Sequence, residues 1–174
     1  MALARPIPTQ NERVLKDEDF IVSKTDPKGI ITYGNRIFIE ISGYEESELL
    51  GAPHAILRHP DMPRTVFKLL WDTIQSGREI NAYVKNLAKD GSFYWVFANV
   101  TPTVDGRGGI LGYHSVRRRP RTEAIQTVTA LYRAMLETER KAGGGQDGMK
   151  ASAALLDRTL QEKGMAYDEF ILGL

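Results

Sequence analysis

Alternating apolar and polar positions near the start of the chain predict a β-hairpin. Residues 20–25 and residues 30–34 are short runs rich in β-branched and aromatic side chains, a composition that favours strands. Asp26-Pro27-Lys28-Gly29 separates the two runs and places proline and glycine where tight turns use them. We therefore expect two strands joined by this turn.

After the hairpin the apolar spacing becomes that of helices. Residues 36–42 place their apolar side chains on one helical face, and Gly43 follows where a left-handed helix end is expected. Residues 44–51 predict a second short helix. Pro63 suits the first turn of a longer helix over residues 64–76.

The next part of the chain returns to a two-residue alternation. Residues 79–86, 92–103 and 110–118 predict three strands, and the two connections, Leu87 to Gly91 and residues 105–109, are short and contain glycine. Short connections require neighbouring strands to be antiparallel. Two strands, a group of short helices and three strands indicate the α+β class: one five-stranded antiparallel sheet with helices on one face.

The last part of the chain has two amphipathic helical patterns, residues 121–141 and residues 148–163, separated by a run of three glycines. Neither helix has a core of its own, so both must bury their apolar stripes elsewhere. They either fold back on the sheet or pair with a second copy of the chain, and the second arrangement gives the homodimer that we expect.

These patterns divide the chain into three parts. Residues 1–19 are polar and contain prolines, which predicts a flexible arm or a short helix that caps the domain. Residues 20–119 form the domain with the sheet, and residues 120–174 form a C-terminal helical extension. Tyr94 and Trp95 alternate along one strand, so one faces the core and the other faces a helix or a partner.

Composition restricts the classes of function. Lys and Arg number 23 against 22 Asp and Glu, and a formal net charge of +1 provides no broad positive field for a nucleic acid. We interpret the short basic cluster from Arg117 to Arg121 as a solvated strand end. The chain contains no cysteine, which excludes disulfides, thiolate metal sites and cysteinyl-flavin photochemistry.

Further absences point to a soluble, non-enzymatic protein. The N-terminus lacks the apolar run of a signal peptide, and no stretch reaches the roughly 20 apolar residues of a spanning helix, so we expect a cytoplasmic location. The three histidines are not spaced as a metal triad. No nucleophile with a matching base and no phosphate-binding glycine loop is visible, which argues against an enzyme.

One segment concentrates the candidate chemistry. Arg58-His59-Pro60-Asp61-Met62-Pro63 places basic and acidic groups between prolines that prevent a regular helix. Phe67 and Trp71 follow four residues apart on the next helix and share a face. We interpret the segment as a wall or entrance of a ligand pocket.

Over roughly residues 20–119, the order of elements and the residues themselves resemble a PAS sensor domain. The chain is similar in particular to the flavin-binding PAS domain of bacterial aerotaxis receptors. The most specific matches are the segment from Arg58 to Pro63 and Tyr94-Trp95-Val96. Further matches are Gly29 to Asn35, Ser42-Gly43-Tyr44, Val84-Lys85-Asn86, Lys89-Asp90-Gly91 and Ala98 to Pro102.

The resemblance implies an FAD held non-covalently between the sheet and the short helices, which signals redox or oxygen state. An amide side chain offers both a donor and an acceptor, so Asn35 and Asn86 are the residues expected at the pyrimidine edge of the flavin. Phe67 and Trp71 are expected to form the aromatic wall.

The same resemblance implies polar contacts at the entrance. Arg58, His59 and Asp61 are expected to line it or to meet the ribityl and phosphate groups, since a guanidinium pairs well with phosphate oxygens. The chain also departs from the family, because Ile80 stands where those receptors usually carry a tryptophan. Leu87-Ala88 replaces arginines that often follow the Lys-Asn pair.

The candidate residues also have plain structural interpretations. Phe67 and Trp71 are then core residues, and Asn35 is a helix cap. Asn86 is then a turn residue, and Arg58 and Asp61 are an ordinary ion pair.

Two alternatives to a flavin sensor stay open. One is a PAS module without a cofactor that serves dimerisation and protein interaction. The other is a haem-binding module with His54 or His59 as the axial ligand. In each case the output passes to a downstream signalling protein or through self-association.

Overall fold

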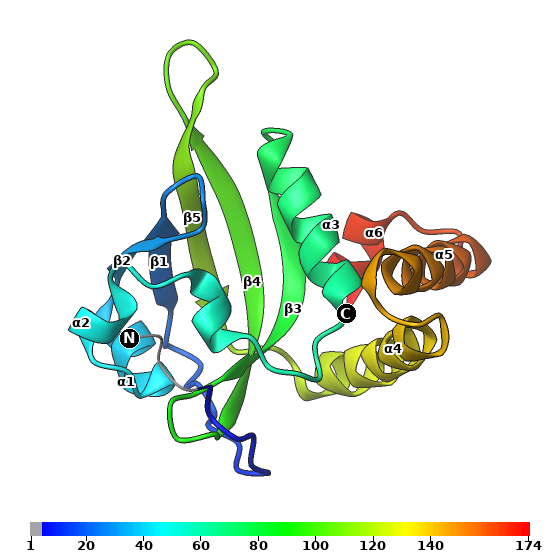
Figure 1. Ribbon diagram of the computed structural model, residues 1–174, viewed down its shortest axis with the longest axis horizontal. Helices are drawn as coiled ribbons and strands as arrows, with labels where there is room; N and C mark the ends of the chain where they lie inside the picture. The colour runs from blue at the N-terminus through cyan, green and yellow to red at the C-terminus, as the bar shows by residue number, and fades with distance from the viewer. Residues whose placement is uncertain (1–4) are drawn as a thin grey trace.

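A computed structural model describes residues 5–174 and shows one five-stranded antiparallel sheet with strand order β2-β1-β5-β4-β3 (Figure 1). Every strand lies within one residue of its sequence-predicted range. The strands are β1 (Ile21–Thr25), β2 (Ile31–Gly34), β3 (Ile80–Leu87), β4 (Phe93–Val104) and β5 (Ile110–Arg118).

The helices fall into two groups along the chain. The first group connects β2 to β3 and consists of α1 (Arg36–Ser42), α2 (Glu46–Leu49), the 3-10 helix η1 (His54–Leu57) and α3 (Arg64–Gln75). The second group follows β5 and consists of α4 (Thr122–Lys141), α5 (Gly145–Lys163) and α6 (Tyr167–Gly173). The sequence did not predict η1 or α6. The α+β class and the five-stranded sheet are confirmed.

Helix α5 begins three residues earlier than the spacing predicted, within the glycine run. Gly143 and Gly144 both have positive φ angles, of 84° and 70°, which turns the chain immediately after α4. Gly144 is the N-cap of α5, and its carbonyl accepts a hydrogen bond from the N–H of Gly148. The run therefore forms a tight helix-to-helix turn.

The two faces of the sheet carry different residues. Val84, Asn86 and Ala98 point to the face covered by η1 and α3, together with alternate residues of β5. Tyr94 is fully buried on this side, whereas its neighbour Trp95 lies on the opposite face and stacks on Tyr132 of α4, with ring centroids 6.4 Å apart. The predicted alternation of these two aromatic residues is confirmed.

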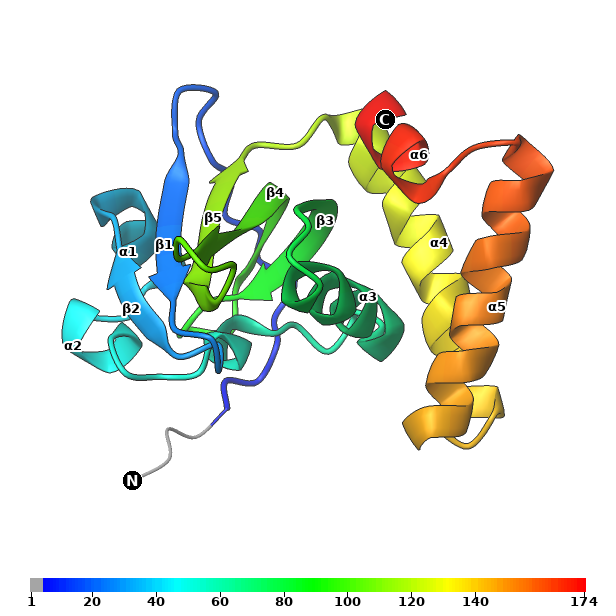
Figure 2. The ribbon, with the colours of Figure 1, turned by 90° about the horizontal axis from the view of Figure 1, so that it is seen from above.

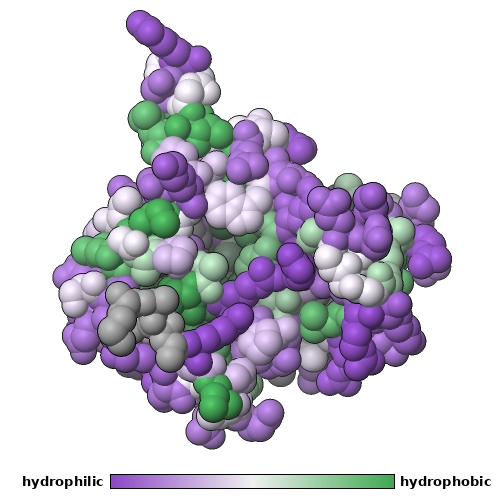
Figure 3. Space-filling view, viewed as in Figure 1, coloured by the Kyte–Doolittle hydropathy of each residue, from purple (hydrophilic) through white to green (hydrophobic). Residues whose placement is uncertain are grey.

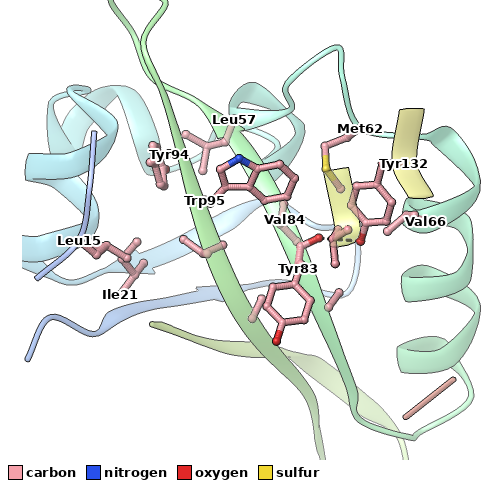
Figure 4. Close-up of a cluster of buried hydrophobic side chains, with 14 of the residues drawn as sticks. Leu15, Ile21, Leu57, Met62, Val66, Tyr83, Val84, Tyr94, Trp95 and Tyr132 are labelled. Carbon is pink, nitrogen blue, oxygen red and sulfur yellow. Dashed lines mark hydrogen bonds between the residues drawn. The ribbon is translucent and has the colours of Figure 1, made fainter. Parts of the chain in front are cut away.

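The C-terminal helices fold back on the same chain, beside the β3 edge of the sheet (Figure 2). Two tyrosine hydroxyls donate to carbonyls of this edge strand: Tyr132 to Tyr83 (2.8 Å, Figure 4) and Tyr167 to Asn81 (3.1 Å). Edge carbonyls are a common site of unwanted strand pairing. The extension thus covers the edge, and its apolar stripe packs within the chain.

The N-terminal segment is extended, and this differs from the expected flexible arm or short helix. Phe93 N–H donates to the Asn11 carbonyl, and Arg13 N–H donates to the Phe93 carbonyl, so the segment pairs with the start of β4. The Arg13 side chain donates to the Ile41 carbonyl (2.9 Å) and pairs with Asp90 (2.8 Å). Residues 1–4 of the expected arm lie outside the described residues.

Within residues 5–174, no helix combines the length and the apolar composition that crossing a membrane requires. The largest fully buried side chains come from the sheet and from both groups of helices. They include Tyr94 of the sheet, Phe38 of α1, Met62 of the proline-bounded segment and Met135 of α4. One core therefore joins the sheet to both groups of helices. Figure 4 shows part of this core.

Candidate functional site

A cavity of about 360 Å³ lies between the sheet and helices η1 and α3. Its size is within the range of small-molecule sites. On the face seen in Figure 3, hydrophilic side chains border a hollow near the centre. Of the seven sequence-predicted site residues, four line this cavity: Arg58, Phe67, Trp71 and Asn86.

The aromatic wall comes mainly from α3. Phe67 and Trp71 both face the cavity, as their four-residue spacing predicted, and Trp71 meets Tyr113 of β5 edge-on at 5.5 Å. Gly29 lies directly under the Trp71 ring: a Cβ added at Gly29 would come within 2.8 Å of it. The turn between β1 and β2 therefore contacts the Trp71 ring and leaves no room for a side chain at position 29.

Asn86 and Arg58 are held together by backbone pairing. An isolated antiparallel bridge joins Arg58 to Asn86, which attaches the proline-bounded segment to β3. The Arg58 guanidinium lies over the Phe67 ring, 4.3 Å from its centroid. The Asn86 side chain is buried, and its Nδ2 has no hydrogen-bond partner among residues 5–174. A buried amide donor without a partner is costly, so Asn86 is available to a ligand.

His59 and Asp61 lie outside the cavity lining. His59 is 3% exposed, its Nδ1 accepts the N–H of Asp61 (3.1 Å), and burial lowers its pKa to about 4. Asp61 pairs with Lys85 (2.7 Å), so the Arg58–Asp61 ion pair weighed from the sequence is not formed. The Met62 sulfur accepts the backbone N–H of Lys85 (3.3 Å). These contacts hold the segment against β3, and the entrance role of His59 and Asp61 stays a prediction.

Asn35 is also outside the cavity lining. Its Oδ1 accepts the N–H groups of Phe38 and Val22, both at 3.1 Å, and its Nδ2 donates to the Phe20 carbonyl at 2.8 Å. The amide thus caps α1 and ties it to β1, which is the plain interpretation of this residue. Its predicted contact with a flavin remains a prediction.

The cavity is lined by several basic side chains, and no Asp or Glu of the described part of the chain lines it. Exposed Lys28, Arg64 and Lys68 lie on the rim, and Lys68 also pairs with Asp72 at 2.6 Å. Arg117 is 2% exposed. The sequence interpretation of the cluster from Arg117 to Arg121 as a solvated strand end is therefore wrong for Arg117.

Two features explain why Arg117 was missed and how it could have been found. It belongs to a run of charged residues, and charge runs are usually solvated. The alternation along β5 nevertheless places Arg117 on the same face as Tyr113 and Ser115, and all three line the cavity. The two-residue alternation continues to the end of the strand, and it could have indicated that Arg117 faces the cavity side of the sheet.

His54 lines the cavity from η1, whereas His59 does not. Burial, with a smaller contribution from the positive charge of Arg117, lowers the pKa of His54 to about 3. Its ring stacks on Phe38 at 6.2 Å. Of the two histidines considered as haem ligands, His54 is the one that faces the cavity.

Ile80, at the position of the family tryptophan, is buried in a small cluster with Ile74 and Tyr113. Trp71 packs against the same cluster. Ile80 therefore belongs to the apolar cluster against which Trp71 of the aromatic wall packs.

The arrangement of sheet, short helices and cavity is that of a PAS domain. The PAS fold family matches residues 31–117, about half of the chain, and the chain belongs to this family.

Among individual proteins, the chain is similar to the aerotaxis receptor of Escherichia coli K12, with 42% identity over 132 residues. That match covers 76% of this chain and 26% of the receptor. It is also similar to a nitrogen fixation regulatory protein of Klebsiella pneumoniae, with 29% identity over 97 residues, which cover 56% of this chain and 20% of the relative. The chain thus spans about a quarter or less of the length of these relatives.

Solved structures agree on the fold. The light-state structure of the blue-light photoreceptor Aureochrome1 LOV superposes with a TM-score of 0.57 at 21% identity, over 66% of this chain and 90% of that one. A light-oxygen-voltage domain studied with a flavin analogue gives a TM-score of 0.54 at 24% identity, over 70% and 86% of the two chains. The predicted PAS fold is confirmed.

Proposed function

We propose that this PAS domain binds FAD non-covalently in the cavity and signals redox or oxygen state without being an enzyme. One observation carries the proposal: an aromatic wall, an unpartnered buried amide and a basic rim converge on the same cavity. The similarity to the aerotaxis receptor supports the sensory part.

The lining residues fit the chemical groups of a flavin nucleotide. Phe67 and Trp71 offer apolar surfaces to a ring system, and Asn86 offers a hydrogen bond to a polar ring edge. Arg58 and Arg64 offer positive charge to phosphates, and a guanidinium binds phosphate oxygens with two parallel hydrogen bonds. When bound, the flavin supplies a redox centre that the side chains of this protein lack.

The route that we propose for the signal runs from α3 to the C-terminal extension. Helix α3, which carries Phe67 and Trp71, is hydrogen-bonded at its first turn to Glu139 of α4. Met149 of α5 lines the cavity. A change in the cavity thus alters contacts made by both helices of the extension. We further propose that the protein is a cytoplasmic homodimer that acts on a downstream signalling protein. Light scattering tests the dimer, and a monomer over a wide concentration range would contradict it.

The first experiment is the visible spectrum of the protein as purified, followed by denaturation and chromatographic identification of the released chromophore. Flavin bands and released FAD are expected. Release of FMN would support a flavin cofactor but would contradict the assignment of FAD. A sharp Soret band would favour haem and His54, and a colourless protein that takes up neither group would leave the cofactor-free interaction module.

Variants then test the site. Asn86→Ala is expected to weaken FAD binding about tenfold, since one hydrogen bond is lost in a buried site. Asn81→Ala is the matched control: it lies on the same strand, and its side chain accepts a hydrogen bond from Asn99 instead of facing the cavity. Equal FAD affinity of the two variants would contradict the assignment of Asn86.

A further inference from the structure

Arg117 lines the cavity, and its buried guanidinium pairs with no carboxylate of the described residues. Its Nη2 donates to the Ser23 hydroxyl, and its guanidinium lies over the Phe38 ring, 4.8 Å from the centroid. Its Nε and Nη1 find no hydrogen-bond partner in the part of the chain that the structure describes. One hydroxyl and one aromatic face are therefore its main protein contacts.

The surroundings of Arg117 provide no negative charge. Burial lowers the pKa of Arg117 to about 10, so the group remains a cation at neutral pH. Of its titratable neighbours, His54 is neutral because burial lowers its pKa, and Tyr94 is neutral because burial raises its pKa. No Asp or Glu within residues 5–174 lines the cavity or pairs with Arg117.

A buried cation of this kind is expensive for the protein alone. Removing a charge from water is costly unless a partner of opposite charge compensates it. Unsatisfied buried polar groups and perturbed charges that line a cavity are candidates for functional sites. The missing partner of Arg117 is therefore to be sought in the cavity.

We propose that Arg117 is an anion-recognition residue at the buried side of the cavity, and that the bound ligand presents a negative charge to it. This inference rests on the flavin function proposed above and deepens it. Reduction of a flavin by dithionite at neutral pH adds two electrons and one proton, which leaves one negative charge on the ring system. Arg117 then favours the reduced over the oxidised ligand.

The test compares Arg117→Met, which removes the charge but keeps the length, with Arg117→Lys, which keeps the charge. Arg107→Met, on the exposed β4–β5 turn, is the matched control. For each FAD-loaded protein, the affinity for oxidised FAD and the midpoint potential are measured. Arg117→Met is expected to lose about tenfold of the preference for reduced FAD, which corresponds to a potential lower by about 30 mV. Arg117→Lys and Arg107→Met are expected to stay close to wild type.

The stability of the ligand-free protein separates recognition from a structural role. Removal of an uncompensated buried charge is expected to leave the melting temperature of Arg117→Met unchanged or higher. A clear fall would assign Arg117 to the packing of Phe38 and Ser23 and overturn the proposal. An unchanged midpoint potential in FAD-loaded Arg117→Met would also overturn it, while the flavin function would stand.

Failure of the flavin function is recognised separately. If the wild-type protein takes up no FAD, that function fails, and the same variants are tested with inorganic phosphate. A rise in melting temperature with phosphate that Arg117→Met lacks and Arg107→Met keeps would support the anion site. An equal response of all variants would overturn it.

Discussion

The carboxylate of Glu139 in α4 accepts hydrogen bonds from the backbone N–H (3.0 Å) and the hydroxyl (2.7 Å) of Thr65 in the first turn of α3. It also accepts the backbone N–H of Arg64 at 3.2 Å. The N-cap of α3 is Pro63, which has no side-chain acceptor. The C-terminal extension therefore supplies the cap that the sequence of α3 lacks, at the end of the helix where a negative charge is favourable.

Replacing this cap is expected to destabilise the whole protein. Glu139→Ala removes the acceptor of two backbone N–H groups and leaves the Thr65 hydroxyl with only the Met149 carbonyl, at 3.3 Å. The expected cost is about 2 to 3 kcal/mol in the free energy of unfolding. Glu137→Ala, which breaks an exposed pair with Lys141, is expected to change it by less than about 0.5 kcal/mol. Urea denaturation measures both, and similar losses in the two variants would show that α4 is not anchored through Glu139.

Gly29 offers a second test, of the position of Trp71. Gly29→Ala forces a side chain onto a residue with φ of 81° and into the Trp71 ring. Gly108→Ala has the same backbone strain, with φ of 82°, but no atom within 4 Å of the new Cβ. Both variants are expected to lose about 1 to 2 kcal/mol of stability. Only Gly29→Ala is expected to shift tryptophan fluorescence and weaken FAD binding; an identical effect of the two substitutions would refute the contact.

The packing of the extension can be tested at one hydroxyl. Tyr132→Phe removes the buried hydrogen bond to the Tyr83 carbonyl, so the free energy of unfolding is expected to fall by about 1 kcal/mol. Tyr33→Phe, at a side chain that is 45% exposed, serves as the control with no expected change. A stability of Tyr132→Phe that equals wild type would argue that the helices do not cover the β3 edge in solution.

The dependence of stability on pH follows from two histidines whose pKa values are lowered in the folded protein. Burial lowers the pKa of His54 to about 3 and of His59 to about 4. In the unfolded chain both return to about 6.5, so below that pH the unfolded state binds more protons than the folded state. The free energy of unfolding is therefore expected to fall from pH 7 to pH 5, by about 2 kcal/mol for each histidine.

Denaturation at pH 7, 6 and 5 measures this slope in a range where most carboxylates remain ionised. His54→Gln cannot take up the proton in either state, so part of the slope is expected to disappear. A slope that is the same in wild type and His54→Gln would mean that His54 does not contribute.

Much of the fold was contained in local sequence patterns. The strands follow from two-residue alternation, and the hairpin follows from Asp26-Pro27-Lys28-Gly29. Phe67 and Trp71 were predicted to share a face because helical spacing depends on neighbours along the chain. Each of these features is decided within a few residues, and such features are the ones that a sequence reveals best.

The rest depended on contacts between distant segments. The amide of Asn35 could serve a helix cap or a ligand, and its bonds to Phe20 and Val22 join segments that meet only in the folded protein. Glu139 looks like any charged residue of an amphipathic helix until α4 meets Thr65. The burial of Arg117 and the folding of the extension onto its own domain are likewise set by packing across the sheet.

Met149 belongs both to the extension and to the lining of the cavity. Thermodynamic linkage makes any coupling through such a shared residue reciprocal. If occupancy of the cavity alters how α5 engages another molecule, that molecule must alter ligand affinity by the same factor. Ligand binding would then change the affinity of the domain for its partner, and the partner would change the affinity for the ligand. The ligand affinity measured for the isolated chain would therefore differ from the affinity in the complex.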